Sequence, residues 1–328
     1  MSLTTATRRS LLVGGAATLG LSACGSEQAD THRTSTHQVT LRGKLGSTEL
    51  TDVPTRLVTL GIGPDTNIAL SLGVTPVAIA RDSNVEGGIE PWTRTALDDA
   101  RPTLIDASAG IPVEKVAAAK PDLIVATTDY QLAKSYDQLT EIAPVLGYTS
   151  GPNTDRWQNT VTRLGTALDR PAKAKNVIAG VEAAVHRLRA AHPELEGKAF
   201  TFGPVQADGT IYTVNSATDL SAALLGQLGL KLSDAVTSLK PSSTPGKSVV
   251  SPERLDLLDA DLLILTYVDT AQRAKLESNP LFQKLSAVKK GHYVAIPFPV
   301  AIAAAFPDPL TVPFALRSMA PKLAAALA

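Results

Sequence analysis

The chain has 328 residues with equal numbers of basic and acidic side chains, so its formal net charge at pH 7 is zero. The sequence has no basic run or stripe that could follow a phosphate backbone, and this excludes nucleic acid as a partner. The length exceeds the usual size of one domain and predicts two lobes. After residue 24 no stretch stays apolar over the roughly 18–20 residues that a membrane-spanning helix requires.

The first 23 residues have the composition of a secretory signal. Arg8 and Arg9 precede an uncharged stretch rich in glycine and alanine, and small residues lead up to Cys24, the only cysteine in the chain. A basic start, an apolar centre and small residues before a cleavage site are typical of a signal peptide. We therefore predict a signal peptide over residues 1–23.

The residues that end at Cys24 indicate a lipid anchor. Leu21-Ser22-Ala23-Cys24 resembles the bacterial lipoprotein signal, in which the cysteine is lipidated and becomes the new N-terminus, and the paired arginines resemble a twin-arginine export signal. The polar, aperiodic stretch after the cysteine predicts a flexible tether, so residues 24–38 are assigned to lipidated cysteine and tether. The protein is then expected on the extracytoplasmic side of the cell membrane. A lone buried thiol behind an ordinary hydrophobic N-terminus is the alternative.

Residues 39–170 are predicted to form an N-terminal α/β lobe. Short apolar runs alternate there with helical patterns, which is typical of parallel strands covered by helices. Val39–Val53 is expected to be a hairpin, because Gly46-Ser47 separates its two alternating stretches. Further strands are expected at Arg56–Leu60, Val77–Ala80, Thr103–Asp106 and Leu123–Thr127, and helices at Asp65–Leu72, Val113–Ala119 and Ala133–Ile142.

Residues 171–192 are predicted to form one long helix. Apolar residues recur at spacings of three and four from Ala174 to Leu188, which marks one helical face. Pro171 suits the first turn of this helix, and Pro193 ends it. At 1.5 Å per residue the helix would extend about 30 Å.

The alternation of strands and helices restarts over residues 193–328, which are predicted to form a C-terminal α/β lobe. Strands are expected at Ala199–Phe202, Ile211–Val214, Leu262–Tyr267 and Tyr293–Ile296, and helices at Ala217–Leu228 and Leu310–Leu327. The predicted fold class is therefore α/β, with two lobes and a long helix between them.

One pattern occurs in both halves of the chain. Glu114 and Glu253, each expected at a helix start, stand eight residues before Asp122 and Asp261, and each aspartate enters an apolar strand. Two copies of such a unit favour two lobes of like topology rather than a solenoid.

Several segments together indicate a family. In the expected order over nearly the whole chain after the tether, the following stretches resemble the periplasmic binding proteins for iron–siderophore complexes: Thr51–Val58, Glu114–Ala126, Leu139–Val145 and Asn279–Gly291. The resemblance implies two α/β lobes joined by one rigid helix, here 171–192, with a ligand cleft between the lobes and small lobe motions. It implies a monomeric substrate-binding protein of an ABC importer and not an enzyme.

The resemblance also gives a role to two exposed acids. In this family a carboxylate on each lobe meets arginines of the membrane permease, and Glu114 and Glu253 match those positions. Exposed ion pairs add little affinity, so the two acids would set the register and the rate of encounter. The alternative is that each glutamate only complements a helix dipole, which is worth about 0.3–1 kcal/mol.

The ligand cleft is expected at the carboxyl ends of the strands, where open α/β sheets bind ligands. Aromatic rings suit a bulky, partly apolar chelate, and arginine can donate to the oxygens around ferric iron. The expected cleft residues are Arg81, Trp92, Tyr130, Trp157, Tyr212, Tyr267, Phe298 and Phe306. Each aromatic residue could instead pack in the core. The loop Ala109–Pro112 lacks the arginine that the hydroxamate-binding pattern often carries there, so the chelate class is left open.

The sequence shows no pattern for catalysis or for a protein-bound metal. The histidines are scattered without ligand spacing, and no nucleophile elbow is present. Pro245-Gly246-Lys247-Ser248 lacks the earlier glycine of a phosphate loop. Ferric iron is expected to arrive already chelated, so no cofactor is needed.

The leading interpretation is a lipid-anchored receptor that captures a ferric siderophore and delivers it to an ABC permease. Haem or cobalamin is the alternative cargo, and for haem Tyr130 and Tyr267 would be the candidate iron ligands. A lipoprotein without a transport role is a third interpretation.

Overall fold

The computed structural model describes residues 37–61, 63–244 and 246–328. The chain from residue 36 to the C-terminus forms one compact unit. The predicted signal peptide, Cys24 and most of the predicted tether lie outside the described residues. Within the described ranges no helix is both long and apolar enough to cross a membrane.

The described chain begins with the predicted hairpin. Strand β1 (Val39–Arg42) pairs antiparallel with β2 (Ser47–Leu50), and the turn between them covers residues 43–46. Thr48 Oγ1 on β2 donates to the carbonyl oxygen of Val145 over 2.6 Å. This buried bond attaches the hairpin to the edge of the first large sheet.

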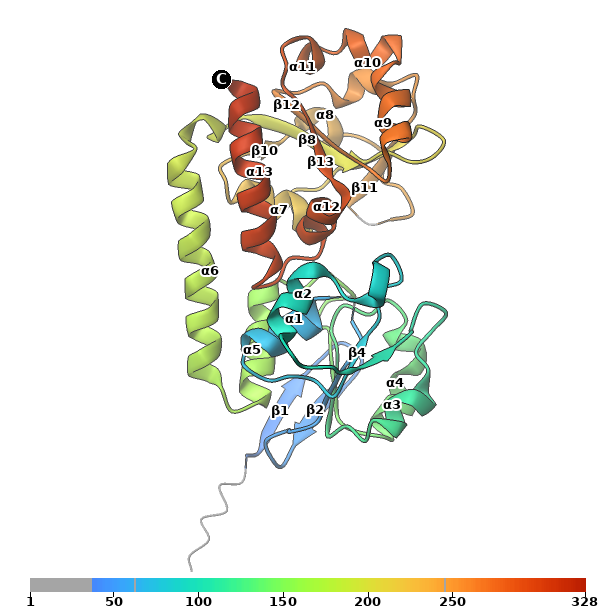
Figure 1. Ribbon diagram of the computed structural model, residues 1–328, viewed down its shortest axis with the longest axis vertical. Coiled ribbons are helices and arrows are strands. Elements are labelled where there is room, and N and C mark those ends of the chain that lie inside the picture. The colour runs from blue at the N-terminus through green and yellow to red at the C-terminus, as the bar shows by residue number, and fades with distance from the viewer. Residues whose placement is uncertain (1–36, 62, 245) are drawn as a thin grey trace, which may run out of the picture. The chain divides into compact units, whose positions relative to one another are not determined.

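The first large sheet has five parallel strands in the order β5-β4-β3-β6-β7. Figure 1 labels β4 of this sheet. All four residues of β6 are buried, as expected for a parallel sheet with both faces covered. The strands are β3 (Leu57–Thr59), β4 (Ala78–Ala80), β5 (Thr103–Ile105), β6 (Leu123–Ala126) and β7 (Val145–Gly147). The first four were predicted within one or two residues, whereas β7 was not predicted.

The helices of this half are α1 (Pro64–Ser71), α2 (Pro91–Leu97), α3 (Val113–Ala118), α4 (Leu132–Thr140) and α5 (Trp157–Ala167), with a 3₁₀ turn η1 (Glu86–Gly88). Most of them connect the strands, and α5 follows the last strand and leads into the long helix. The predictions for α1, α3 and α4 are confirmed. Helices α2 and α5 were not predicted.

The long helix is present as α6, Pro171–Ala191, with 21 residues. Pro171 occupies its first turn, and the chain turns into the 3₁₀ segment η2 (Pro193–Leu195) just after it. Its buried residues are Ala174, Val181 and Val185. These residues share the face that the apolar spacing predicted, and α6 packs with this face on α5 and on the terminal helix α13 (Thr311–Leu327).

The second half contains a four-stranded parallel sheet in the order β10-β8-β12-β13 and a two-stranded antiparallel sheet β11-β9. The strands are β8 (Ala199–Pro204), β9 (Ile211–Val214), β10 (Lys231–Leu232), β11 (Lys247–Val250), β12 (Leu262–Tyr267) and β13 (Tyr293–Pro297). The predictions for β8, β9, β12 and β13 are confirmed.

The helices of the second half are mostly short. They are α7 (Leu220–Gly226), α8 (Asp234–Thr237), η3 (Leu255–Leu258), α9 (Thr270–Glu277), α10 (Pro280–Lys284), α11 (Ser286–Lys289), α12 (Phe298–Ala305) and α13 (Thr311–Leu327). Helix α7 and the terminal helix α13 were predicted, α7 about three residues too long at its start.

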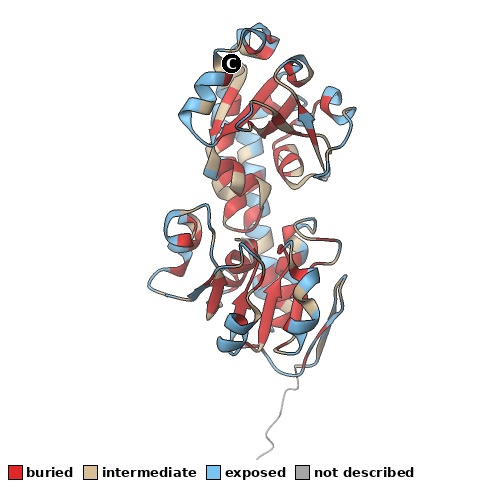
Figure 2. Cartoon of the chain, turned by 90° about the vertical axis from the view of Figure 1, so that its right-hand side faces the viewer, coloured by how far each residue is buried: buried red, intermediate tan, exposed pale blue. Residues whose placement is uncertain are grey.

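One hydrophobic core joins the two halves. It contains Leu57 of the first sheet, Val181 of α6, Phe200 of the second sheet and Leu316 of α13. Two smaller core clusters each belong to one half. Figure 2 shows the buried residues on the strands and on the inward faces of the helices. The architecture is therefore α/β with two lobes, each built around a parallel sheet.

The helix expected at Glu253 is not present in the predicted form. Glu253 lies in a turn, and the chain then forms the single 3₁₀ turn η3. Leu255 and Leu258 are both buried, and a spacing of three residues matches the 3₁₀ period. The Asp259 carboxylate, directly after η3, accepts from the backbone nitrogens of Ser286 and Ala287.

Candidate functional site

A cavity of about 650 Å³ lies at the carboxyl ends of the strands of the second sheet. Three strand ends contribute to it: Pro204 closes β8, Tyr267 closes β12, and Phe298 follows β13. Helix α9 adds Gln272 and Lys275. Open α/β sheets hold ligands at this edge, so the cavity is the candidate ligand site.

The hydroxyl group of Tyr267 is hydrogen-bonded to Tyr293, which does not line the cavity. Tyr293 Oη donates to Glu277 Oε1 over 3.0 Å, and Arg273 Nε donates to the same oxygen over 2.6 Å. Because the Tyr293 proton is used in this way, Tyr267 must donate the hydrogen in the 2.7 Å bond between the two phenol oxygens. Tyr267 therefore presents its ring, not its hydroxyl proton, to the cavity.

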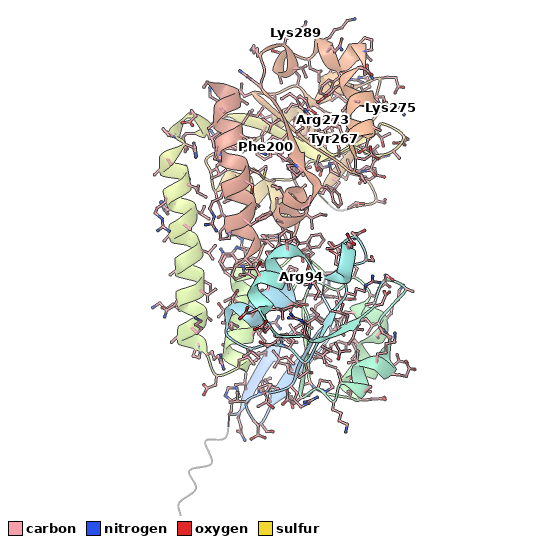
Figure 3. All side chains as sticks on the ribbon, viewed as in Figure 1. Arg94, Phe200, Tyr267, Arg273, Lys275 and Lys289 are labelled. Carbon is pink, nitrogen blue, oxygen red and sulfur yellow. The ribbon has the colours of Figure 1, made fainter. Side chains whose placement is uncertain are left out.

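The same environment keeps Tyr267 protonated. Burial raises its pKa to about 12, and the Glu277 carboxylate adds to the shift. Burial also raises the pKa of Tyr293. A tyrosine binds ferric iron as the phenolate, so Tyr267 is poorly suited as an iron ligand near neutral pH. Figure 3 labels Tyr267, Arg273 and Lys275, which lie in the same region of the second half.

Polar side chains also line the cavity. Thr266 is one of them, and its Oγ1 is buried and has no hydrogen-bond partner among the described residues. Gln272 Oε1 accepts from the backbone nitrogen of Val268, so its amide nitrogen remains to donate. The Lys275 ammonium adds a positive charge. The wall thus combines aromatic surface with hydrogen-bond donors.

The strand ends of the first sheet are organised by Asp65. This fully buried carboxylate accepts from the backbone nitrogens of Gly61 and Thr127 at 3.1 and 2.9 Å and from the Thr127 hydroxyl. Burial raises its pKa to about 6, against the effect of these bonds. A side chain at position 61 would collide with Asp65 and Thr128, so the close approach requires glycine.

Buried polar contacts link the two halves. Asn67 Nδ2 on α1 donates to Asp308 Oδ2 over 2.7 Å, and Thr93 Oγ1 donates to Asn67 Oδ1 over 2.6 Å. The other carboxylate oxygen of Asp308 accepts from the backbone nitrogens of Leu310 and Thr311 at 2.7 and 2.9 Å, where α13 begins. One carboxylate thus accepts from backbone nitrogens at the start of a helix of the second half and from a side chain on a helix of the first.

Acidic side chains crowd this junction. Burial raises the pKa of Asp308 to about 7, with the charge of Glu90 as a further cause. Burial also raises the pKa of Glu90, which is only 7% exposed. A hollow of about 10 Å³ lies among these side chains, lined also by the predicted cleft residues Trp92 and Phe306.

The structure brings together only some of the predicted cleft residues. Tyr267 and Phe298 line the strand-end cavity, which no residue of the first lobe lines within the described chain. Arg81 follows β4, is exposed and lies 3.8 Å from the Asp106 carboxylate. Tyr130 follows β6 and is 56% exposed; partial burial of its hydroxyl raises its pKa, and the Asp219 carboxylate of the second half raises it further.

The remaining predicted cleft residues lie elsewhere. Trp157 is buried in the core at the start of α5, and Trp92 packs on Phe314 of α13 with a ring separation of 5.0 Å. Tyr212 lies within β9 opposite Val249, not at a strand end of the large sheet. Burial in the core makes Trp157 unsuitable as a wall of an open cleft.

Glu114 and Glu253 are both exposed, and no ion pair involves either of them within the described chain. Glu114 lies in the first turn of α3 and borders a hollow of about 580 Å³ between α3 and α4, together with Glu141. A hydrogen bond with Ser251 lowers the pKa of Glu253, which favours its ionised form. Each glutamate is therefore accessible to a partner.

Sequence reasoning did not single out the cavity residues Thr266, Gln272 and Lys275. The sequence feature that could have indicated them is Asp269. Its side chain accepts from the backbone nitrogen of Gln272 and caps α9. A capping aspartate directly after a buried strand predicts a helix start, which places the next residues at the strand end.

The described residues contain no group of three or more histidine, cysteine, aspartate or glutamate side chains arranged to hold a metal ion. The cavity wall likewise contains no histidine among the described residues.

Comparison with known proteins identifies the family. A sequence model of the family described as "Periplasmic binding protein" matches residues 66–300. The chain belongs to this family. The match covers the whole second parallel sheet and four of the five strands of the first, since β3 lies before residue 66, and it extends past the strand-end cavity to Val300 in α12.

Individual members of the periplasmic binding protein family are similar over most of the chain. The putative ABC transporter substrate-binding lipoprotein YhfQ of Bacillus subtilis is 28% identical over 83% of this chain and 85% of its own length. The Fe(3+)-citrate-binding protein YfmC of Bacillus subtilis is 27% identical over 75% of this chain and 74% of its own length. The crystal structure of Streptococcus pneumoniae PiaA in complex with ferrichrome has a TM-score of 0.76 at 26% identity and covers 88% of this chain and 99% of that one.

Proposed function

We propose that this protein is the binding component of an ABC importer and that its cargo is a ferric siderophore or a related ferric chelate. The strand-end cavity with its aromatic and donor-bearing wall is the observation that carries the proposal, in a chain whose relatives include a ferric-citrate-binding protein and a structure holding ferrichrome. These two relatives hold different chelates, so the family leaves the chelate class of this chain open.

The chemistry of the cavity supports a large, oxygen-rich ligand. The rings of Tyr267 and Phe298 provide apolar contact area, and Lys275 can donate to the anionic oxygens of a chelate. Iron would enter as cargo already enclosed by its chelator, so the protein need not supply a metal ligand.

Haem is the weaker candidate. Tyr267 is protonated and its hydroxyl proton is directed to Tyr293, which leaves it unsuited to bind iron. The raised pKa of Tyr130 also disfavours a phenolate. Among the described residues no histidine lines the cavity that could replace them.

The direct test is a calorimetric titration of a chain that starts at Thr36, because residues 36–328 form one compact unit that contains all described core clusters. Ferric hydroxamate, catecholate and carboxylate chelates are compared with haem and cobalamin. We expect one ferric chelate class to saturate at one site and to bind more tightly than its iron-free form. Saturation by haem or cobalamin alone, or by no compound, would contradict the proposal.

We further propose that the protein is exported, lipidated at Cys24 and held at the extracytoplasmic membrane face as a monomer. The relative YhfQ is described as a lipoprotein, which supports the anchor. Lipidation is tested by mass spectrometry of the membrane-extracted protein, which should show a diacylglyceryl-modified Cys24 at the N-terminus.

Glu114 and Glu253 are proposed to contact the permease. Exposed ion pairs contribute about 0–1 kcal/mol each, so Glu114→Ala or Glu253→Ala should slow uptake of the iron chelate up to about fivefold, and the double variant by about tenfold. The initial rate of uptake into cells measures this effect, and cargo affinity should not change. Glu49→Ala, which removes an exposed glutamate from β2, is the matched control. Unchanged uptake in the double variant would refute the docking role.

A further inference from the structure

A second large cavity, of about 660 Å³, lies between α6 and α13 and does not share residues with the strand-end cavity. The two helices contact each other and lie side by side in Figure 1. Val177, Val181 and Leu188 of α6 supply apolar surface to this groove. We call this cavity the α6–α13 groove.

Three cations border the α6–α13 groove. Lys173 and Arg187 come from α6, and Arg317 comes from α13. Within the described chain none of them is in an ion pair. Helix α13 has no acidic residue, and the only acid of α6, Glu182, accepts from the Gln158 side chain over 3.2 Å instead. The groove is therefore both apolar and positively charged.

Gly180 leaves the centre of the groove open. Glycine in the middle of a helix costs roughly 0.5–1 kcal/mol relative to alanine, and here it is exposed. A Cβ atom at this position would meet no other atom within 4 Å, so packing within the protein does not require glycine. A bare backbone at a cavity wall permits close approach by a bound molecule.

The cations that border the groove are spread along its length. Lys173 and Arg187 are 14 residues apart on α6, which corresponds to about 21 Å along the axis. Arg317 Nε donates to the carbonyl oxygen of Pro313 over 3.0 Å, which leaves the Nη groups of its guanidinium for another acceptor. Two guanidinium groups from facing helices suit an oxyanion such as a phosphate or carboxylate.

From these observations we propose that the α6–α13 groove binds a single-chain organic anion. Its oxyanion head is held by Arg187 and Arg317, and its apolar chain lies over Gly180 and along Val177 and Val181 toward Lys173. The groove is also lined by Ser71 at the end of α1, so a bound chain would contact both halves of the protein. Binding is therefore expected to raise the unfolding temperature.

The test uses the chain that starts at Thr36 and octyl phosphate as the probe, with calorimetry as the readout. We expect octyl phosphate to saturate at one site, and octanol or inorganic phosphate alone to bind at least about tenfold more weakly. If octanol binds as tightly as octyl phosphate, the groove is only an apolar surface. If inorganic phosphate binds as tightly as octyl phosphate, the groove is only an unspecific anion site. Either result would overturn the proposal, as would no binding of octyl phosphate.

Variants locate the site. Arg187→Gln and Arg317→Gln should each weaken octyl phosphate binding about tenfold, because each removes a charge-assisted hydrogen bond. Lys175→Gln, which removes an exposed α6 cation that does not line the groove, should leave the affinity within about twofold. An equal loss in Lys175→Gln would mean that only the general positive field attracts the anion, and the proposal would fail.

A leucine tests the role of the open backbone. Gly180→Leu should abolish octyl phosphate binding by filling the groove, and it should not unfold the protein because leucine favours the helix. Ala183→Leu, on the exposed side of α6 outside the groove, is the matched control and should bind normally. Normal affinity in Gly180→Leu would exclude the groove as the binding site.

Discussion

Replacement of Asp308 by alanine is expected to lower the free energy of unfolding by about 3 kcal/mol. The change removes the acceptor of the Asn67 amide and of the backbone nitrogens of Leu310 and Thr311 at the start of α13; the donors of Asn67 and Thr311 are buried, and that of Leu310 is partly buried. A buried donor without an acceptor lowers the free energy of unfolding by more than the loss of an exposed hydrogen bond does. Urea unfolding at pH 7 measures the loss. A loss below about 1 kcal/mol would show that water or a shifted side chain replaces the carboxylate.

The aspartate also predicts a pH dependence. Its pKa is about 7 in the folded protein and near 3.8 in the unfolded chain, so the folded state holds the proton more tightly. Stability should therefore fall as the pH rises from about 4 to about 7 and change little from this group above that range. Asp65 and Glu90, whose pKa values are also raised by burial, act in the same direction.

Asp308→Asn separates the two effects of this residue. Asparagine keeps the size and one carbonyl oxygen to accept from the backbone at α13, so its loss of stability should be smaller than that of alanine. It cannot titrate, so stability should depend less on pH between 4 and 7 than in the wild-type protein. The same slope in both proteins would show that Asp308 does not cause the pH dependence, which would then come from other buried carboxylates with raised pKa values such as Asp65, Glu90 and Asp129.

The second large effect concerns ligand binding. Tyr267→Ala should weaken binding of the ferric chelate by about 10- to 100-fold, because a buried aromatic wall at a binding site contributes about 1–3 kcal/mol. Tyr267→Phe should bind within about threefold of the wild type, since the hydroxyl proton is directed away from the cavity to Tyr293. Calorimetry on protein shown to be folded by circular dichroism measures both affinities.

Tyr293→Phe is the matched control for this pair. It removes the hydroxyl behind Tyr267 without changing the cavity wall, since Tyr293 does not line the cavity. Its affinity should also stay close to the wild type. If Tyr267→Phe loses as much affinity as Tyr267→Ala, the hydroxyl contacts the ligand directly and the direction of the hydrogen-bond chain is reversed when the ligand binds.

Strong periodicity explains which elements were predictable. Helix α6 has a continuous apolar face between two prolines, and all six residues of β12 are buried. In both elements the apolar pattern of the sequence matches the burial in the structure. Strand β7 has three residues, as do β3, β4 and β5, which were predicted, so its length does not explain why it was not predicted. Helices α9 through α11 are short and mostly exposed. Such elements are stabilised mainly by tertiary contacts and caps, which leave little periodic signal.

The candidate site was predictable only in part. Tyr267 and Phe298 were found because the carboxyl ends of strands meet at one edge of a sheet, a rule that needs only the strand positions. The same rule selected Arg81 and Tyr130 in the first lobe, and neither lines this cavity. Trp157, expected on a nearby connection, lies at the start of α5 and is buried in the core. An aromatic residue near a strand end can line a cleft or pack in the core, and the local sequence does not show which residues it will contact in the fold.

By itself the sequence determined the alternation of strands and helices, the long helix and the family, because these depend on local spacing and on motifs read along the chain. Only the tertiary structure decided that Asn67 meets Asp308, that Tyr293 turns the proton of Tyr267 away from the cavity, and that cations of α6 and α13 border one groove. Each of these contacts joins residues far apart in the chain. Their geometry follows from packing two lobes on a shared core, which no local pattern encodes.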